Sequence, residues 1–228
     1  RTPLIAMHGS FSLLKNYAAG MSPAEVNEFV DAAMQGIDRL SAEIDDILGY
    51  IGASALAING EIVTVASFAE QAKAVAAELE IAKMAVVYPP ELAGRTLPLS
   101  ARSLNSILWE ILENSKKFHP THTPNVTVEF AHPEPELCRL RFTDDGLNLN
   151  PEQLQWVWTP YVQAEKYFTG EAPGMGLGLP LVATLVWQVG GQARLYNSQD
   201  GPGIVVELDI PHRLLRAAAL DDQKREIG

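Results

Sequence analysis

The chain has 228 residues and a formal net charge of −11, with 17 basic against 28 acidic side chains. This charge argues against a general binder of nucleic acid or of anionic membranes, because both repel an acidic protein. Hydrophobic residues make up 47% of the sequence, which is enough for a packed core and excludes a disordered chain.

The first 52 residues predict two helices that form an antiparallel hairpin. Apolar residues recur every three or four positions in both, most regularly from position 26 to 51, as in a helix packed along a narrow seam. Between the two runs, Ser22, Pro23 and Glu25 have the spacing of a helix N-cap with a capping box. Because two helices alone cover these stripes poorly, we expect a homodimer that completes a four-helix bundle. The alternative is a hairpin that packs onto its own globular domain.

Strand and helix patterns are mixed in the segment that follows, residues 61–211. Strands are predicted at 62–65, 84–88, 126–130, 137–142, 192–196 and 204–210, and helices at 68–79, 100–118 and 179–189. This alternation predicts a layered α/β sandwich. The expected fold class is therefore α+β: a helical hairpin at 1–52, the sandwich at 61–211, and a charged tail at 212–228.

The single cysteine, Cys138, cannot form an internal disulfide and lies in a predicted strand. A reducing, cytoplasmic compartment is therefore expected. No apolar run approaches the length of a membrane span, so any membrane attachment is expected only through regions outside this chain.

The first of three chemically informative motifs lies on the helix predicted at 100–118. Glu110 and Asn114 are one helical turn apart, and Lys117 follows on the same side. An acid, an amide oxygen and an ammonium on one stripe can hold a hydrated Mg²⁺ and a polyphosphate. Taken alone, such a stripe is more often the solvated face of an amphipathic helix.

The second motif is Asp144, which follows the strand predicted at 137–142, together with Gly146. A carboxylate at a strand end can accept a hydrogen bond from the exocyclic amine of adenine, and a glycine lets the backbone approach a flat ring. Taken alone, an Asp-Gly pair of this kind is a common turn.

The third motif places Gly174, Gly176 and Gly178 directly before the helix predicted at 179–189. Backbone N–H groups of such a loop can approach phosphate oxygens, and the helix that follows points its positive end at them. No Lys-Ser/Thr pair follows, so the loop is not a P-loop, and its place in the chain is not that of a Rossmann fingerprint. The polar run at 161–173 is compatible with a lid over a ligand.

In this order, the three motifs resemble the N, G1 and G2 boxes of the histidine-kinase ATP-binding domain, a branch of the GHKL ATPase superfamily. Residues 157–161 resemble the intervening F box, and the hairpin resembles the dimerisation and histidine-phosphotransfer domain. Residues 1–4, Arg-Thr-Pro-Leu, resemble the second half of the acceptor motif His-Glu-x-x-Thr-Pro-Leu. The resemblance covers residues 1–211, and four motifs in order make it specific.

The resemblance implies ATP and Mg²⁺ as ligands and assigns a role to each matching residue. Asn114 would bind Mg²⁺, Lys117 would lie beside the phosphates, and Asp144 would hold the adenine amine. The other positions carried over are Glu110, which faces the nucleotide; Gly146 and Asn148 of the G1 box; Gly174, Gly176, Leu177, Gly178 and Leu179 around the phosphates; and Thr2, which would help to place water during dephosphorylation of a partner.

The function implied is that of a two-component sensor histidine kinase core. ATP would phosphorylate a histidine three residues before Arg1, and the group would pass to an aspartate of a response-regulator receiver domain, with phosphatase activity as a further property. Three departures stand out: Asn148 replaces the second G1 glycine, Gln163 replaces the basic residue that ends the F box, and Ile204 replaces a small hydroxyl residue. They keep open an alternative, a degenerate kinase-like phosphotransfer or scaffold protein that dimerises and binds a response regulator with weak or no use of ATP.

Overall fold

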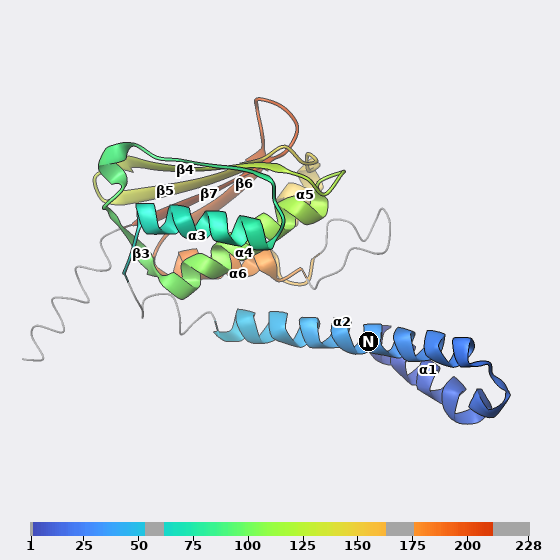
Figure 1. Ribbon diagram of the computed structural model, residues 1–228. Coiled ribbons are helices and arrows are strands. Elements are labelled where there is room, and N and C mark those ends of the chain that lie inside the picture. Colours follow the sequence, from blue (N-terminus) through green and yellow to red (C-terminus); the bar gives the residue numbers. More distant parts are fainter. Residues whose placement is uncertain (1, 53–61, 163–175, 212–228) are drawn as a thin grey trace, which may run out of the picture. The chain divides into compact units, whose positions relative to one another are not determined.

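The computed structural model describes residues 2–52, 62–162 and 176–211, which fall into two compact units, an N-terminal helical hairpin and an α/β sandwich (Figure 1). Within these residues, no helix combines the length and the apolar character needed to cross a membrane.

The hairpin consists of α1 (Thr2–Tyr17) and α2 (Pro23–Gly52), joined by the short 3-10 helix η1 (Ala18–Gly20). The predicted capping box is present, because the Ser22 backbone N–H donates to Glu25 Oε2 at 2.7 Å and Ser22 Oγ accepts from the Glu25 N–H at 3.3 Å. Large apolar residues of the predicted stripe stay partly exposed within one chain: Leu4 52%, Phe11 50%, Val30 41%, Ile37 37% and Ile44 48%. One hairpin therefore leaves much of its apolar stripe in water.

The sandwich contains a five-stranded sheet with α3, α4 and α6 over one face (Figure 1). Its elements in chain order are β1 (Ile62–Thr64), α3 (Val65–Glu78), β2 (Lys83–Val87), η3 (Pro90–Leu92), β3 (Thr96–Ser100), α4 (Ala101–Phe118), β4 (Asn125–Glu134), β5 (Leu137–Asp144), α5 (Pro151–Trp156), α6 (Gly178–Gln188), β6 (Gln192–Asn197) and β7 (Ile204–Pro211). The large sheet has the order β2-β4-β5-β7-β6, with β2 and β4 parallel and the other pairs antiparallel, and β1 pairs with β3 separately. The predicted α+β class is confirmed.

The sequence does not predict β3 and α5, nor the short 3-10 helices η1 and η3. β3 contains Pro98, which lowers the strand signal, and it pairs with β1 outside the main sheet. α5 is only six residues long, although a capping box between Asn150 and Gln153 marks its start. The first strand is also shorter than predicted, because Thr64 accepts a hydrogen bond from the Ser67 N–H and caps α3.

The core is built between α4 and the inner face of the sheet. Ser100 caps α4, and one face of this helix is buried from Leu104 through Leu108 to Ser115. Alternate residues of β5 are buried from Cys138 to Asp144, so the helix-facing row of this strand ends in a carboxylate. The period of two along β5 thus directs the Asp144 side chain into the layer where α4 lies.

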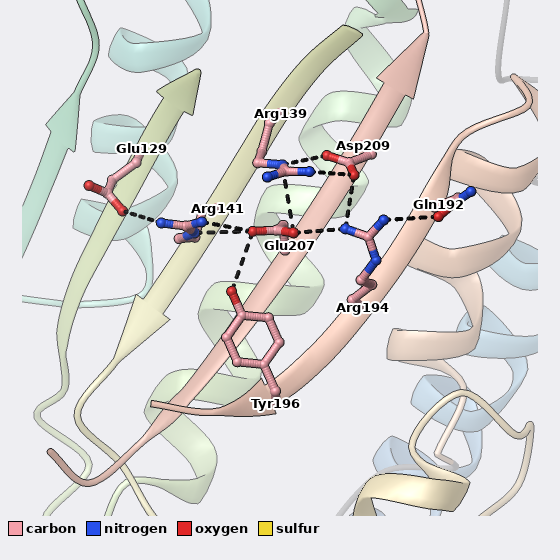
Figure 2. A network of polar contacts seen from close by, with 8 residues as sticks. All are labelled: Glu129, Arg139, Arg141, Gln192, Arg194, Tyr196, Glu207 and Asp209. Atoms are coloured by element: carbon pink, nitrogen blue, oxygen red, sulfur yellow. Dashed lines mark hydrogen bonds and ion pairs between the residues drawn. The ribbon is translucent and has the colours of Figure 1, made fainter. Parts of the chain in front are cut away.

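The opposite face of the sheet carries a network of three arginines around two buried carboxylates (Figure 2). Glu207 and Asp209 of β7 are each only 5% exposed. Arg139 binds Asp209 with two N–H groups at 2.6 and 2.8 Å, and Arg141 donates to Glu207 at 2.9 Å. Arg194 reaches both carboxylates, at 2.9 and 3.0 Å. These residues face one another because β5 and β6 flank β7 in register.

This network lowers the pKa of both carboxyl groups. For Asp209 the main cause is the hydrogen bond from Arg139, which outweighs the effect of burial. For Glu207, burial alone would raise the pKa, but the hydrogen bonds and charges of the three arginines lower it below the ordinary value. Both groups therefore stabilise the fold in their ionised form.

We predict that acidification weakens the sandwich through Glu207 and Asp209. A carboxyl whose pKa is lowered by folding stabilises fully above its unfolded pKa of about 4 and loses this effect as the pH falls through the folded value. The double variant Glu207→Gln/Asp209→Asn should lose about 2–3 kcal/mol of unfolding free energy at pH 7, because it leaves three arginines poorly paired. Its stability should also vary less between pH 7 and pH 3, as measured by urea unfolding.

Glu129→Gln is the matched control for this prediction. Glu129 is on the same face, is 45% exposed, and lies 3.8 Å from Arg141, so its loss should cost less than about 0.5 kcal/mol. An equal pH dependence in the double variant and the unmodified chain would contradict the assignment.

Candidate nucleotide site

Asp144 is held at the end of β5 by groups from three parts of the chain. Its side chain is buried, and Oδ1 accepts from the backbone N–H groups of Gly146 at 3.0 Å and Ile204 at 3.2 Å. Oδ2 lies 3.0 Å from the Ser115 hydroxyl. A carboxylate offers about four acceptor positions, and these contacts use three of them. Asp144 is thus fixed in orientation, with an acceptor position on Oδ2 beyond these contacts.

Ser115 is a site residue that sequence reasoning missed. Its hydroxyl lies 3.0 Å from Asp144 Oδ2 and 3.1 Å from the carbonyl of Ile111, so α4 supplies a buried donor beside the carboxylate. A signal existed in the sequence, because Ser115 continues the apolar row of Leu108 and Ile111 at helical spacing. A polar residue at the end of a buried row needs a partner, and Asp144 provides it.

The loop after Asp144 is tied to the turn between β6 and β7. Asn148 Oδ1 accepts from the Gly203 N–H at 2.8 Å, and Asn197 forms two 2.8 Å hydrogen bonds with the backbone of Leu149. Gly203 has φ +111, and a Cβ there would lie 2.7 Å from the carbonyl carbon of Asp144. Only glycine fits so close to the strand end. The Asn148 side-chain oxygen therefore serves to bind this turn.

The flank of α4 meets the start of α6. Glu110, Asn114 and Lys117 are all half-buried along one side of α4. A Cβ on Gly178 would overlap the Glu110 carboxylate and would lie 3.7 Å from the Asn114 amide nitrogen. Glu110 and Asn114 thus lie together at the N-terminus of α6, where backbone N–H groups favour a negatively charged ligand. Lys117 extends over the ring of Phe118, with Nζ 4.8 Å from its centroid.

The turn before α6 depends on a second glycine. Gly176 has φ +69, and a Cβ there would lie 2.6 Å from the backbone oxygen of Val162. Its carbonyl accepts from the Tyr161 N–H at 3.2 Å, which joins the start of α6 to the end of the predicted F box. Leu177 is buried, and its carbonyl accepts the Leu181 N–H at 2.8 Å, while Leu179 is half-buried in the first turn of α6.

Most of the predicted site residues fall into two groups within the sandwich, although some predicted positions cannot be compared. Gly174, Gln163 and most of the expected lid lie outside the described residues, as does the predicted tail. Thr2 begins α1, in the hairpin unit.

Among the described residues, no three His, Cys, Asp or Glu side chains gather as a metal site would require. A Mg²⁺ ion at the Asn114 end would be held by this amide together with water and phosphate oxygens, which is the ligand set that Mg²⁺ prefers.

Comparison with known proteins shows which family this sandwich resembles. Residues 100–214 match the family model described as histidine kinase-, DNA gyrase B- and HSP90-like ATPase. The autoinducer 2 sensor kinase/phosphatase LuxQ of Vibrio cholerae is 34% identical over 115 residues, which cover 49% of this chain and 13% of LuxQ. The chain thus spans only a small part of this relative's length.

Two of the similar solved structures cover most of this chain. The Acinetobacter baumannii histidine kinase AdeS has a TM-score of 0.64 at 16% identity, covering 93% of this chain and 96% of AdeS. Full-length ShkA, solved in complex with AMPPNP, has a TM-score of 0.61 at 21% identity, covering 92% of this chain and 43% of ShkA. At this identity the likeness shows the fold.

The family match extends from the cap of α4 to the end of β7, and so includes Asp144, Asn114 and the start of α6. The chain therefore belongs to the family of histidine kinase-, DNA gyrase B- and HSP90-like ATPases, and its similarity extends to the sensor kinase LuxQ and the histidine kinase AdeS.

Proposed function

We propose that the sandwich binds Mg-ATP with its base at Asp144 and its phosphates at the N-terminus of α6. The observation that carries this proposal is the orientation of the buried Asp144 carboxylate, fixed by Ser115, Gly146 and Ile204 with an acceptor position beyond these contacts. The exocyclic amine of adenine donates to that position. Gly146 is buried against Asp144 and leaves room for the flat ring, as a side chain there would not.

The phosphate end lies where α4 meets α6. Asn114 provides an amide oxygen for Mg²⁺, and Lys117 places a positive charge on the same flank of α4. Three glycines and two leucines shape the loop around the phosphates: Gly174, Gly176, Leu177, Gly178 and Leu179. Glu110 of α4 lies beside Gly178, in the first turn of α6, and faces the nucleotide.

The proposed activity is that of a two-component sensor kinase core. The γ-phosphoryl group of ATP passes to a histidine of the helical hairpin, expected three residues before Arg1, and then to an aspartate of a response-regulator receiver domain. Thr2, at the start of α1, helps to place water when the regulator is dephosphorylated. Phosphoryl transfer of this kind depends on positioned charges and an in-line nucleophile.

The proposed assembly is a homodimer in which two hairpins form a four-helix bundle. The exposed apolar residues of α1 and α2 support it, since Leu4, Phe11, Ile37 and Ile44 are each more than a third exposed in one chain. A regulator would dock on the helical hairpin that carries the acceptor.

The nucleotide site is tested by Asp144→Asn. An amide presents an N–H₂ group where the carboxylate accepts, so ATP affinity should fall by an amount on the order of 1–3 kcal/mol in a calorimetric titration. Asp38→Asn, an exposed change of the same kind on α2, is the control and should leave the affinity unchanged. No measurable ATP binding by the unmodified chain would reject the site and favour a scaffold.

The metal end is tested separately by Asn114→Ala. This change should reduce the gain in ATP affinity that Mg²⁺ provides and leave the affinity measured with a chelator nearly unchanged, because it removes only the amide ligand. The measurement is the ratio of the dissociation constants with and without Mg²⁺. A loss of the same size under both conditions would contradict the assignment of Asn114.

The dimer is tested by Ile37→Asp/Ile44→Asp. The charges would be buried without partners in the helical seam, so the chain should become monomeric in light scattering. Gln35→Glu adds negative charge at an exposed position of α2 away from this seam and should leave the dimer intact. A double variant that remains dimeric would contradict the bundle.

Phosphoryl transfer is tested with labelled ATP. Residues 1–228 should gain no acid-labile phosphohistidine, whereas a chain extended upstream should be labelled and should lose the label when the histidine three residues before Arg1 is replaced. His8 is the internal control, because it is exposed on α1 and lies several turns from the acceptor position. Labelling of His8 in the shorter chain would overturn the proposed acceptor.

A further inference from the structure

Asp145 lies between Asp144 and Gly146, the two residues proposed to hold adenine, and its side chain is bound by Asn125 at the start of β4. Its carboxylate accepts from the backbone N–H of Asn125 at 2.8 Å and from the Asn125 side-chain amide. Burial raises the pKa of the Asp145 carboxyl, but the hydrogen bonds from Asn125 lower it below its ordinary value. Asp145 is therefore an ionised anchor between the end of β5 and the start of β4.

His119 contacts the same anchor from the end of α4. Its Nδ1 accepts from the backbone N–H groups of Thr121 at 3.2 Å and Thr123 at 3.3 Å. An accepting Nδ1 carries no hydrogen, so the neutral ring has its hydrogen on Nε2. Nε2 lies 3.4 Å from Asp145 Oδ1, and the His119 side chain is only 12% exposed. The ring is thus fixed on one edge by its own turn and presents the other edge to Asp145.

The backbone of His119 also touches the loop. A Cβ built on Gly146 would lie 3.9 Å from the His119 Cα and 3.1 Å from Asp144 Oδ1. The residue that holds Asp145 through its ring therefore also lies beside Gly146. Asp145 is the carboxylate that the structure places against this ring, and the neighbouring His122 turns its Nδ1 to the Lys116 carbonyl, 3.1 Å away.

We propose that His119 and Asp145 act as a positioning pair that fixes the backbone of residues 144–146 and thereby sets adenine affinity and selectivity. This inference rests on the proposed function for its ligand. The neutral His119 ring holds Asp145, Asp145 holds the loop against β4, and the loop presents Asp144 and Gly146 to the base. The pair touches only the base end, so it acts equally on every nucleotide that shares the adenine ring.

The experiment compares His119→Ala, Asp145→Ala and their double variant in the 228-residue chain. Without nucleotide, amide hydrogen exchange at 144–149 should accelerate in each. ATP and ADP affinity should fall by the same factor, about five- to tenfold, and the preference for ATP over GTP should shrink. Because the two residues act through one contact, the double variant should be no worse than either single variant within about twofold.

His122→Asn is the matched control. It should change neither the amide exchange at 144–149 nor the nucleotide affinity, since asparagine tolerates the positive φ of 54 at this position. His119→Gln places an amide nitrogen near the position of Nε2 and should restore most of the affinity, which separates positioning from folding. Three results would contradict the proposed positioning pair. They are unchanged amide exchange at 144–149 in His119→Ala, additive losses of affinity in the double variant, and a change only in the ratio of ATP to ADP affinity. If the unmodified chain bound no adenine nucleotide, the proposed function would fail, and the exchange measurement would still decide the pair.

Discussion

The burial of one carboxylate, Asp144, beneath helix α4 is the constraint on which the proposed nucleotide site depends. A buried carboxylate is costly unless donors surround it, and here Ser115 and two backbone N–H groups provide them. Each donor comes from a different element, so satisfying this one group brings α4, the loop after β5 and the start of β7 together. The stability of the fold and the orientation of the proposed adenine acceptor therefore rest on the same contacts.

Helix α4 connects the two ends of the proposed site through adjacent residues. Ser115 lies on the buried face and meets Asp144, while Asn114 lies on the flank and meets Gly178 at the start of α6. Because the helix is rigid and packed over its whole length, the base end and the phosphate end cannot shift independently. A rigid link between the two ends suits an ATP site, because binding of the base must then hold the phosphates in a defined place.

The other face of the sheet is stabilised by different means. Glu207 and Asp209 would be unfavourable so deeply buried, but three arginines from the flanking strands cover them and leave their own outer edges in water (Figure 2). The row Arg141, Glu207, Arg194 crosses β5, β7 and β6 with alternating charge. The sheet that carries Asp144 thus gains a fixed register from polar pairs as well as from its core.

The sequence by itself determined the elements whose signals are local. The alternation along β5 up to Asp144 and the capping box of Ser22 and Glu25 both act over a few residues, and the structure places both as predicted. Tertiary structure alone decided which side chains meet. Ser115 and Asp144 are 29 positions apart, Asn148 and Gly203 are 55 apart, and His119 meets Asp145 only because the end of β5 lies beside the turn that follows α4. Local patterns predict which face of a helix or strand a side chain lies on. Its partner depends on packing between distant segments, which no short-range period encodes.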